Sequence, residues 1–156
     1  MKAFRFRAQA ILDLRIRHRD AIQAELAQAE RAEHDASAAV EHADRRLQRA
    51  GADGADALRA GGPITEFERH RNWIAHLRDE GDRLRTVRHE RAAEVSRVRE
   101  RLRVAHQQVR VLERLRDQMS KRHEAAVRHE EMRELDEIAT LRFSRQQSQG
   151  RSARGS

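Results

Sequence analysis

The chain has 156 residues, of which 38% are charged and 3% are aromatic, with one proline and no cysteine. This composition is typical of long helices and coiled coils rather than of a globular domain with a large core, and it excludes disulfides and thiolate chemistry. The net charge is +7. Its excess lies at the two ends, since residues 1–19 carry six basic side chains and one acid, and residues 142–156 carry four arginines and no acid.

No apolar run approaches the roughly 18 residues that a membrane span needs. Arginines interrupt the apolar residues after Met1, so we expect no signal peptide. We therefore expect a cytoplasmic protein, peripheral to a membrane at most. Disorder is the competing interpretation of so charged a chain, and the apolar periodicity described below decides against it for most of the length.

The first predicted element is a helix over residues 4–50. Its apolar residues recur at helical spacing without Gly or Pro: Phe4, Ala8, Ile11, Leu14, Ile22, Leu26, Ala29, Ala36, Val40, Ala43, Leu47 and Ala50. Between residues 27 and 46 this stripe is almost entirely Ala. Because Ala buries little apolar area, we expect the middle of the helix to pack weakly or adaptably.

Residues 51–63 (GADGADALRAGGP) are the predicted loop, with four of the seven glycines and the only proline. Gly51 suits a left-handed helix cap there. We place the second helix at residues 64–143, where Thr65 and Glu68 fit a capping box. The tail, residues 144–156, is rich in Ser, Gln, Gly and Arg and is predicted to be a disordered basic tail.

The second helix carries the clearest pattern in the chain. Apolar residues alternate in steps of three and four: Val95, Val98, Leu102, Ala105, Val109 and Leu112. A repeat of 3.5 residues produces a narrow apolar seam that packs against another helix. The fold prediction is therefore all-α, a long antiparallel two-helix coiled-coil hairpin forming one domain over residues 1–143.

The two predicted helices differ in length, about 70 Å against about 120 Å. If they pair outward from the loop, Phe4 lies near residue 110, and roughly 30 residues of the second helix lack a partner within the chain. These residues still carry an apolar stripe. Such a stripe requires a partner protein or self-association.

No catalytic or metal-binding motif emerges. His123 and Glu124 begin like the zinc motif H-E-x-x-H, but Val127 stands where the second His is needed. His34 and His42 can share a helix face without any further ligand cluster. The only Gly-rich loop lacks Lys, so it does not match a phosphate-binding loop. We expect no enzymatic activity, no metal and no cofactor.

Two features remain as interaction candidates. The basic ends, with Phe4 and Phe6 among cations, are compatible with nucleic acid or an anionic membrane, although five aromatics make base-stacking platforms improbable. Trp73 lies beside seam position Ile74. Its partial exposure would suit a partner contact, and shielding of the hairpin apex is the structural alternative.

Two blocks at opposite ends of the chain resemble the flagellar FliJ family. The opening FRFRAQAILDLRIRHRD matches the aromatic-alternating start of that family and its Leu-x-Leu-Arg at residues 12–15. The second block begins with Leu112–Leu115 and continues through Glu130, Leu135–Ala139 and Phe143 at family-like spacing. His123 replaces an expected aromatic residue, and the loop is unusually rich in Gly. The stalk proteins of virulence type III secretion systems are therefore the alternative family.

The resemblance implies a non-enzymatic stalk of the flagellar type III export apparatus, at the flagellar base beside the inner membrane. It implies binding in the pore of the hexameric export ATPase, contact with the membrane export gate, and escort of export chaperones. The residues we assign to the ATPase are Phe4, Phe6, Ile11, Leu14, Leu135, Ile138, Leu141 and Arg142. Those we assign to the gate are Phe67, Trp73, Ile74 and Leu77. A structural coiled-coil dimer with basic ends that bind nucleic acid or a membrane is the alternative of a different class.

Overall fold

The computed structural model describes the backbone of residues 3–152, with the side chains of residues 3–143 and Arg145. Two helices make up the fold: α1 (Gln9–Arg59, 51 residues) and α2 (Ile64–Ser152, 89 residues). No strand occurs among these residues. The predicted all-α helical hairpin is thus confirmed.

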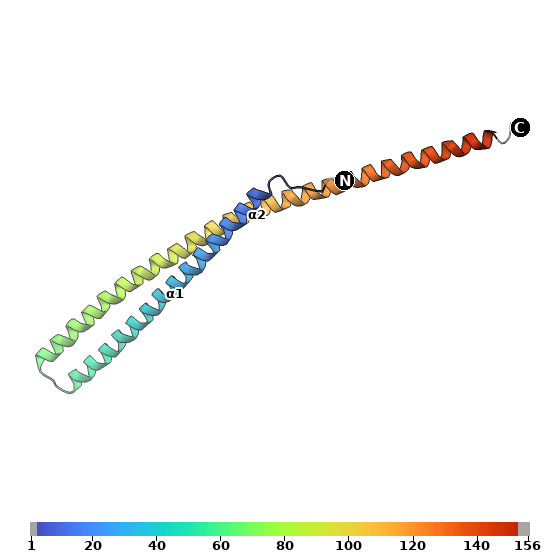
Figure 1. Ribbon diagram of the computed structural model, residues 1–156. Helices are drawn as coiled ribbons and strands as arrows, with labels where there is room; N and C mark the ends of the chain where they lie inside the picture. Colours follow the sequence, from blue (N-terminus) through green and yellow to red (C-terminus); the bar gives the residue numbers. More distant parts are fainter. Residues whose placement is uncertain (1–2, 153–156) are drawn as a thin grey trace. The chain divides into compact units, whose positions relative to one another are not determined.

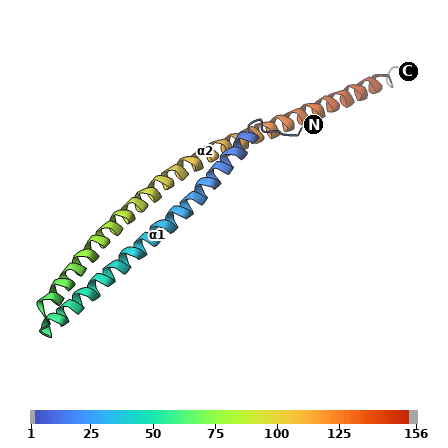
Figure 2. The ribbon, with the colours of Figure 1, turned by 60° about the vertical axis from the view of Figure 1, so that its left-hand side comes forward.

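The chain forms two compact units, which we describe separately. The hairpin unit is Arg15–Gln107, and the end unit combines the described residues before and after it. In the hairpin unit the two helices run side by side in opposite directions, joined by a tight turn (Figures 1 and 2).

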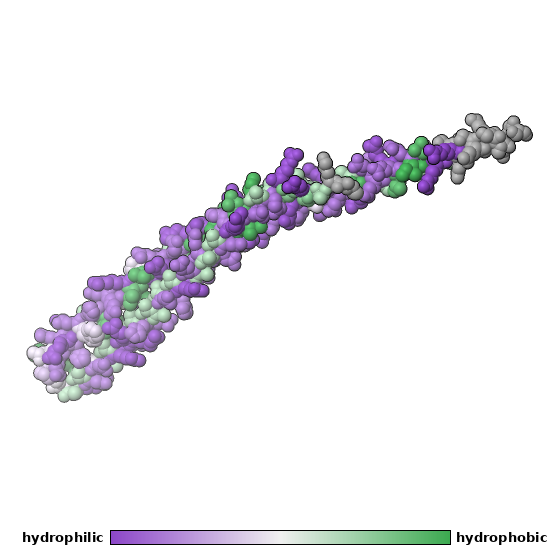
Figure 3. Space-filling view, viewed as in Figure 1, coloured by the Kyte–Doolittle hydropathy of each residue, from purple (hydrophilic) through white to green (hydrophobic). Residues whose placement is uncertain are grey.

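The predicted seam of α2 supplies the core. In the hairpin unit, Val98 and Ala105 form a buried cluster with Ile22 of α1, and Leu26 and Leu102 pack against it. In the end unit, Val109 is buried and Leu112 is half-buried. Full burial of an aliphatic side chain contributes about 1.5–3 kcal/mol. This seam is therefore the main source of stability in a chain whose remaining surface is largely hydrophilic (Figure 3).

Ion pairs between the helices show the antiparallel register of the hairpin unit. As α1 advances, its partners on α2 move back along the chain. The pairs are Glu25 with Arg101 at 2.8 Å, Glu30 with Arg99 at 2.7 Å, Asp44 with Arg85 at 2.6 Å, and Arg46 with Glu80 at 3.0 Å. Exposed pairs of this kind contribute about 0–1 kcal/mol each. They therefore favour one alignment of the helices more than they stabilise the fold.

In the middle of the hairpin, α1 buries Val40 but α2 contributes no buried residue. Ala36 and Ala39 are only half-buried, and no residue of α2 between Leu84 and Glu94 is buried or half-buried. Val87 and Leu115, which lie near the line of the seam, are both exposed. Gly81 is buried at its seam position instead, and α2 continues through it without interruption.

The predicted loop, residues 51–63, is wrong at its start. Helix α1 continues through Gly51 and Gly54 to Arg59, and only residues 60–63 connect the helices. Alanines between these glycines favour helix, and a glycine costs only about 1 kcal/mol relative to Ala. The left-handed cap is Gly61, with φ of +73°, rather than Gly51.

Hydrogen bonds at the turn explain both helix ends. The Gly61 N–H donates to the Leu58 carbonyl at 3.2 Å and the Gly62 N–H to the Ala57 carbonyl at 3.5 Å, which is the Schellman pattern. Helix α2 begins at Ile64, where the Pro63 carbonyl accepts from the Glu66 N–H at 2.9 Å. Thr65 already lies inside the first turn, so the predicted capping box does not form.

The N-terminal segment also differs from the prediction. Helix α1 begins at Gln9, and the residues from Ala3 to Ala8 are not helical. The Phe4 and His123 rings lie 5.8 Å apart, so Phe4 reaches residue 123 rather than residue 110. The shorter loop accounts for this difference, since α1 residues pair with α2 residues farther along the chain than expected.

The second helix ends later than predicted. Helix α2 runs to Ser152 instead of residue 143, so it overlaps most of the predicted disordered tail, 144–156. Gln and Arg have good helix propensity and no proline follows residue 63, so nothing local stops the helix near Phe143. The last part of that tail, residues 153–156, lies outside the described residues.

Two glycine substitutions test the assignment of the turn. We predict that Gly61→Ala destabilises the hairpin by about 1–2 kcal/mol, because Ala is strained at a left-handed φ. Gly51→Ala should stabilise it by up to about 1 kcal/mol, because an added Cβ meets no atom within 4 Å. Thermal unfolding followed by circular dichroism measures both changes. Equal effects of the two substitutions would contradict this turn.

Candidate partner-binding surfaces

Neighbouring apolar residues in the N-terminal part of the end unit differ in how far they are buried. Leu12 is completely buried, whereas Ile11 and Leu14, which the sequence placed on the seam, are exposed. Phe4 and Phe6 are half-buried. Ile11 and Leu14 thus lie off the packed face of α1. Together with Phe4 and Phe6, the other N-terminal residues assigned to the ATPase, they offer apolar surface that is at least partly accessible.

The distal part of α2 carries the other residues assigned to the ATPase. From Arg128 to Phe143 every residue is exposed. The large apolar residues among them are Met132, Leu135, Ile138, Leu141 and Phe143. Leu135 and Ile138 are three residues apart, and Arg142 follows four residues later, so these three share one side of the helix. Figure 3 shows hydrophobic side chains among hydrophilic ones on this part of α2.

The residues assigned to the gate fall into three environments near the turn. Phe67 is 47% exposed and Trp73 is 45% exposed. Ile74 is half-buried between the helices, and Leu77 is only 2% exposed. A partner could therefore reach Phe67, Trp73 and part of Ile74. Leu77 is packed in the core and is not accessible to a partner.

Contacts from both helices hold Trp73 in place. Its ring stacks on His76 with centroids 5.6 Å apart, and the Arg46 guanidinium lies 5.8 Å from the Trp73 centroid. Glu80 orients that guanidinium through hydrogen bonds of 3.0 and 3.2 Å. Stacking and cation–π attraction thus fix a large aromatic ring at the surface, which is a property of interface hot spots.

A groove next to the turn was missed in the sequence. It lies between α1 and α2 and encloses about 340 Å³, lined by Gly51, Gly54, Ala55, Leu58, Phe67, His70, Arg71, Ile74, Ala75 and Arg78. Residues 51–58 were predicted to lie in a loop, where they would not form the face of a helix. The spacing of Gly51, Gly54 and Leu58, at three and four residues, was the available signal.

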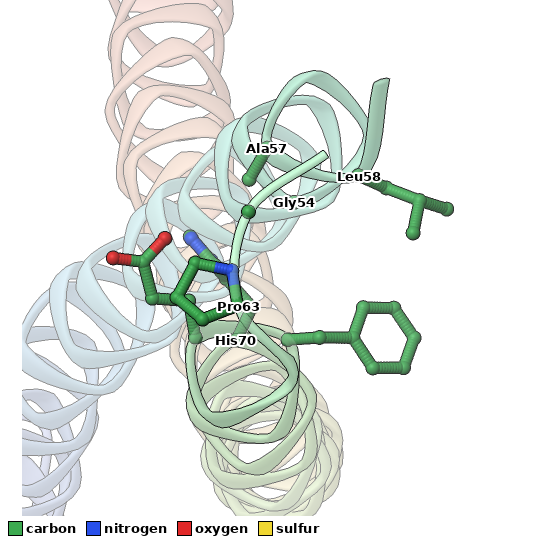
Figure 4. A pocket seen from close by; sticks show the side chains of 8 residues that line it. Gly54, Ala57, Leu58, Pro63 and His70 are labelled. Carbon is green, nitrogen blue, oxygen red and sulfur yellow. The ribbon is translucent and has the colours of Figure 1, made fainter. Parts of the chain in front are cut away.

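A second cavity beside it is too small for a ligand. It encloses about 20 Å³ and is lined by residues of both helix ends and the connection between them, including Gly54, Ala57, Pro63 and His70. Figure 4 shows these residues around it, with the Leu58 side chain directed away from the helix pair. Such a volume holds about one water molecule.

The chemistry of the described surface gives no sign of catalysis. Among residues 3–143 and Arg145, no three His, Asp or Glu side chains gather as metal ligands. A hydrogen bond from Arg103 lowers the pKa of the Glu100 carboxyl, but this pair is exposed on one helix face. No described helix is long and apolar enough to cross a membrane.

A family model described as "Flagellar FliJ protein" matches residues 4–148. The chain belongs to the FliJ family. It is therefore a component of the flagellar export apparatus, in a family of structural export components rather than enzymes. The match is to the flagellar family that the sequence resembled. No curated protein and no solved structure is significantly similar to the chain.

Substitutions in the first turn of α1 test the separation of packed and accessible residues. We predict that Leu12→Ala destabilises the end unit by about 2–5 kcal/mol, because it leaves a cavity at a completely buried site. Ile11→Ala and Leu14→Ala should change the stability by no more than about 0.5 kcal/mol. Hydrogen exchange of residues 9–14 measures the difference. Similar effects at all three positions would show that this face is misassigned.

Proposed function

We propose that this FliJ family member is a stalk that links the hexameric export ATPase to the export gate. The observation that carries the proposal is the exposed apolar stripe of α2 between Arg128 and Phe143. Leu135 is 61% exposed there, in a stretch without any buried residue. A soluble helix that keeps such a stripe is stable in the cell when a partner covers it.

The ATPase contact combines both ends of the chain. Phe4 and Phe6 belong to the same compact unit as Leu135 and Ile138. The Phe4–His123 contact holds the N-terminal segment along α2. We assign Ile11, Leu14, Leu141 and Arg142 to the same contact because all four are exposed.

The gate contact lies at the turn of the hairpin unit. Trp73 is held rigidly while half of its surface stays accessible, so a partner can bury it at little cost in side-chain entropy. Phe67 and Ile74 would join this contact, and Leu77 would support it from the core. Escort of export chaperones stays a prediction of the family resemblance, because no feature of the described residues identifies a chaperone site.

The ATPase contact is tested by Leu135→Ala combined with Ile138→Ala. We predict at least a tenfold loss of affinity for the purified hexameric export ATPase, about 1.4 kcal/mol or more, because two anchors of the interface are truncated. The matched control is Val87→Ala with Val104→Ala, which removes two exposed valines from the hairpin unit. Unchanged ATPase affinity in the first variant, or a stable homodimer that covers the stripe, would contradict the proposal.

The gate contact is tested by Trp73→Ala. We predict weaker binding to the cytoplasmic part of the export gate protein, by about 1–3 kcal/mol, with ATPase affinity unchanged. Surface plasmon resonance with each partner separates the two effects. If gate affinity is the same in the variant and in the Val87→Ala control, Trp73 is not a gate residue.

A further inference from the structure

The groove beside the turn combines apolar walls with an open floor. Leu58 and Phe67, both large and exposed, line it together with the half-buried Ile74. Gly51 and Gly54 of α1 line the part that we call its floor. Its volume, about 340 Å³, falls at the small end of the range for ligand clefts.

The two glycines create this space without being required by packing. A Cβ added to Gly51 meets no atom within 4 Å, and one added to Gly54 meets the Ile74 Cδ1 at an ordinary 3.8 Å. Each glycine lies inside α1, where Gly is less favourable than Ala. Close helix approach therefore does not explain either residue. Their effect is to keep an apolar groove open at the expense of helix stability.

The titratable side chains that line the groove itself are all basic, whereas Glu66 lines the smaller cavity beside it. Arg71 and Arg78 line it together with His70, and no carboxylate does. Neither guanidinium forms an ion pair with a described residue. An occupant with carboxylates near its apolar part would pair with these cations, whereas a basic occupant would be repelled.

We propose that this groove binds one large apolar side chain from an acidic segment of a partner protein. The apolar side chain would lie over Gly51 and Gly54 between Leu58 and Phe67, and flanking carboxylates would pair with Arg71 and Arg78. This goes beyond the gate contact proposed above, because it defines a groove and the chemistry of its occupant whichever protein supplies it. A side chain fits the enclosed shape better than a lipid surface, which would contact exposed side chains without entering a groove.

The experiment uses the full-length protein and a fluorescein-labelled peptide, Glu-Asp-Leu-Phe-Asp-Glu, followed by fluorescence anisotropy. We expect saturable binding that weakens as salt is added. Gly54→Leu, which fills the floor, should weaken binding at least tenfold. The matched control Ala52→Leu adds the same side chain to an exposed position outside the groove and should leave binding unchanged. Circular dichroism verifies that both variants keep their helices.

Charge reversal tests the second half of the proposal. Arg71→Glu combined with Arg78→Glu should weaken binding of the acidic peptide at least tenfold and should permit binding of the peptide Lys-Arg-Leu-Phe-Arg-Lys. Equal binding of the acidic peptide to wild type and Gly54→Leu would overturn the groove. A second outcome would also overturn the proposal that a protein segment occupies the groove. In that outcome the peptide does not bind, while anionic phosphatidylserine vesicles bind wild type and Gly54→Leu equally well.

Different experimental outcomes would contradict the proposed groove and the proposed gate contact. Gate binding lost in Trp73→Ala but retained in Gly54→Leu, together with no peptide binding, removes the groove inference and leaves the gate contact standing. Peptide binding that depends on Gly54, together with gate affinity unchanged in Trp73→Ala, removes the gate contact and leaves the groove.

Discussion

The structure depends on burial of one narrow apolar seam between two helices. With 38% charged residues, the described residues bury no other large apolar surface within the chain, and the surface ion pairs contribute little each. Residues such as Ile22, Val98 and Val109 therefore bear most of the stability. Because a coiled coil buries only its seam, all other helix faces remain available for binding partners, and exposed apolar residues on those faces are the informative ones.

Burial divides neighbouring apolar residues into a packed set and an exposed set. Leu12 is packed while Ile11 and Leu14 are exposed, and Leu77 is packed while Trp73 is exposed. In both places a displacement of a few residues along a helix moves a side chain from the seam to the surface. The type of an apolar residue in this protein therefore does not reveal whether its side chain packs between the helices or lies on the surface.

The periodicity of α2 made the fold predictable, since steps of three and four residues leave only one face to bury. The seam from Val95 to Leu112 follows the predicted pattern. The turn was not predictable from glycine content, because Gly51 and Gly54 stay helical within an Ala-rich segment and only Gly61 adopts a left-handed φ. That error also shifted the pairing of Phe4 and concealed the groove. The exposed distal stripe could be predicted from the unequal helix lengths. The burial of Leu77 could not, because it depends on the register in which the two helices pack, and several neighbouring apolar residues could occupy the seam.

We propose above all that the stretch of α2 from residue 128 to 143 becomes covered by the export ATPase. Hydrogen exchange of the full-length protein, with and without the hexameric ATPase, measures this directly, because amide protection reports local opening of a helix. We predict strong protection of residues 128–143 on ATPase addition, with little change near residues 80–95. Exchange that stays the same with the ATPase, or protection that depends only on the protein's own concentration, would contradict it.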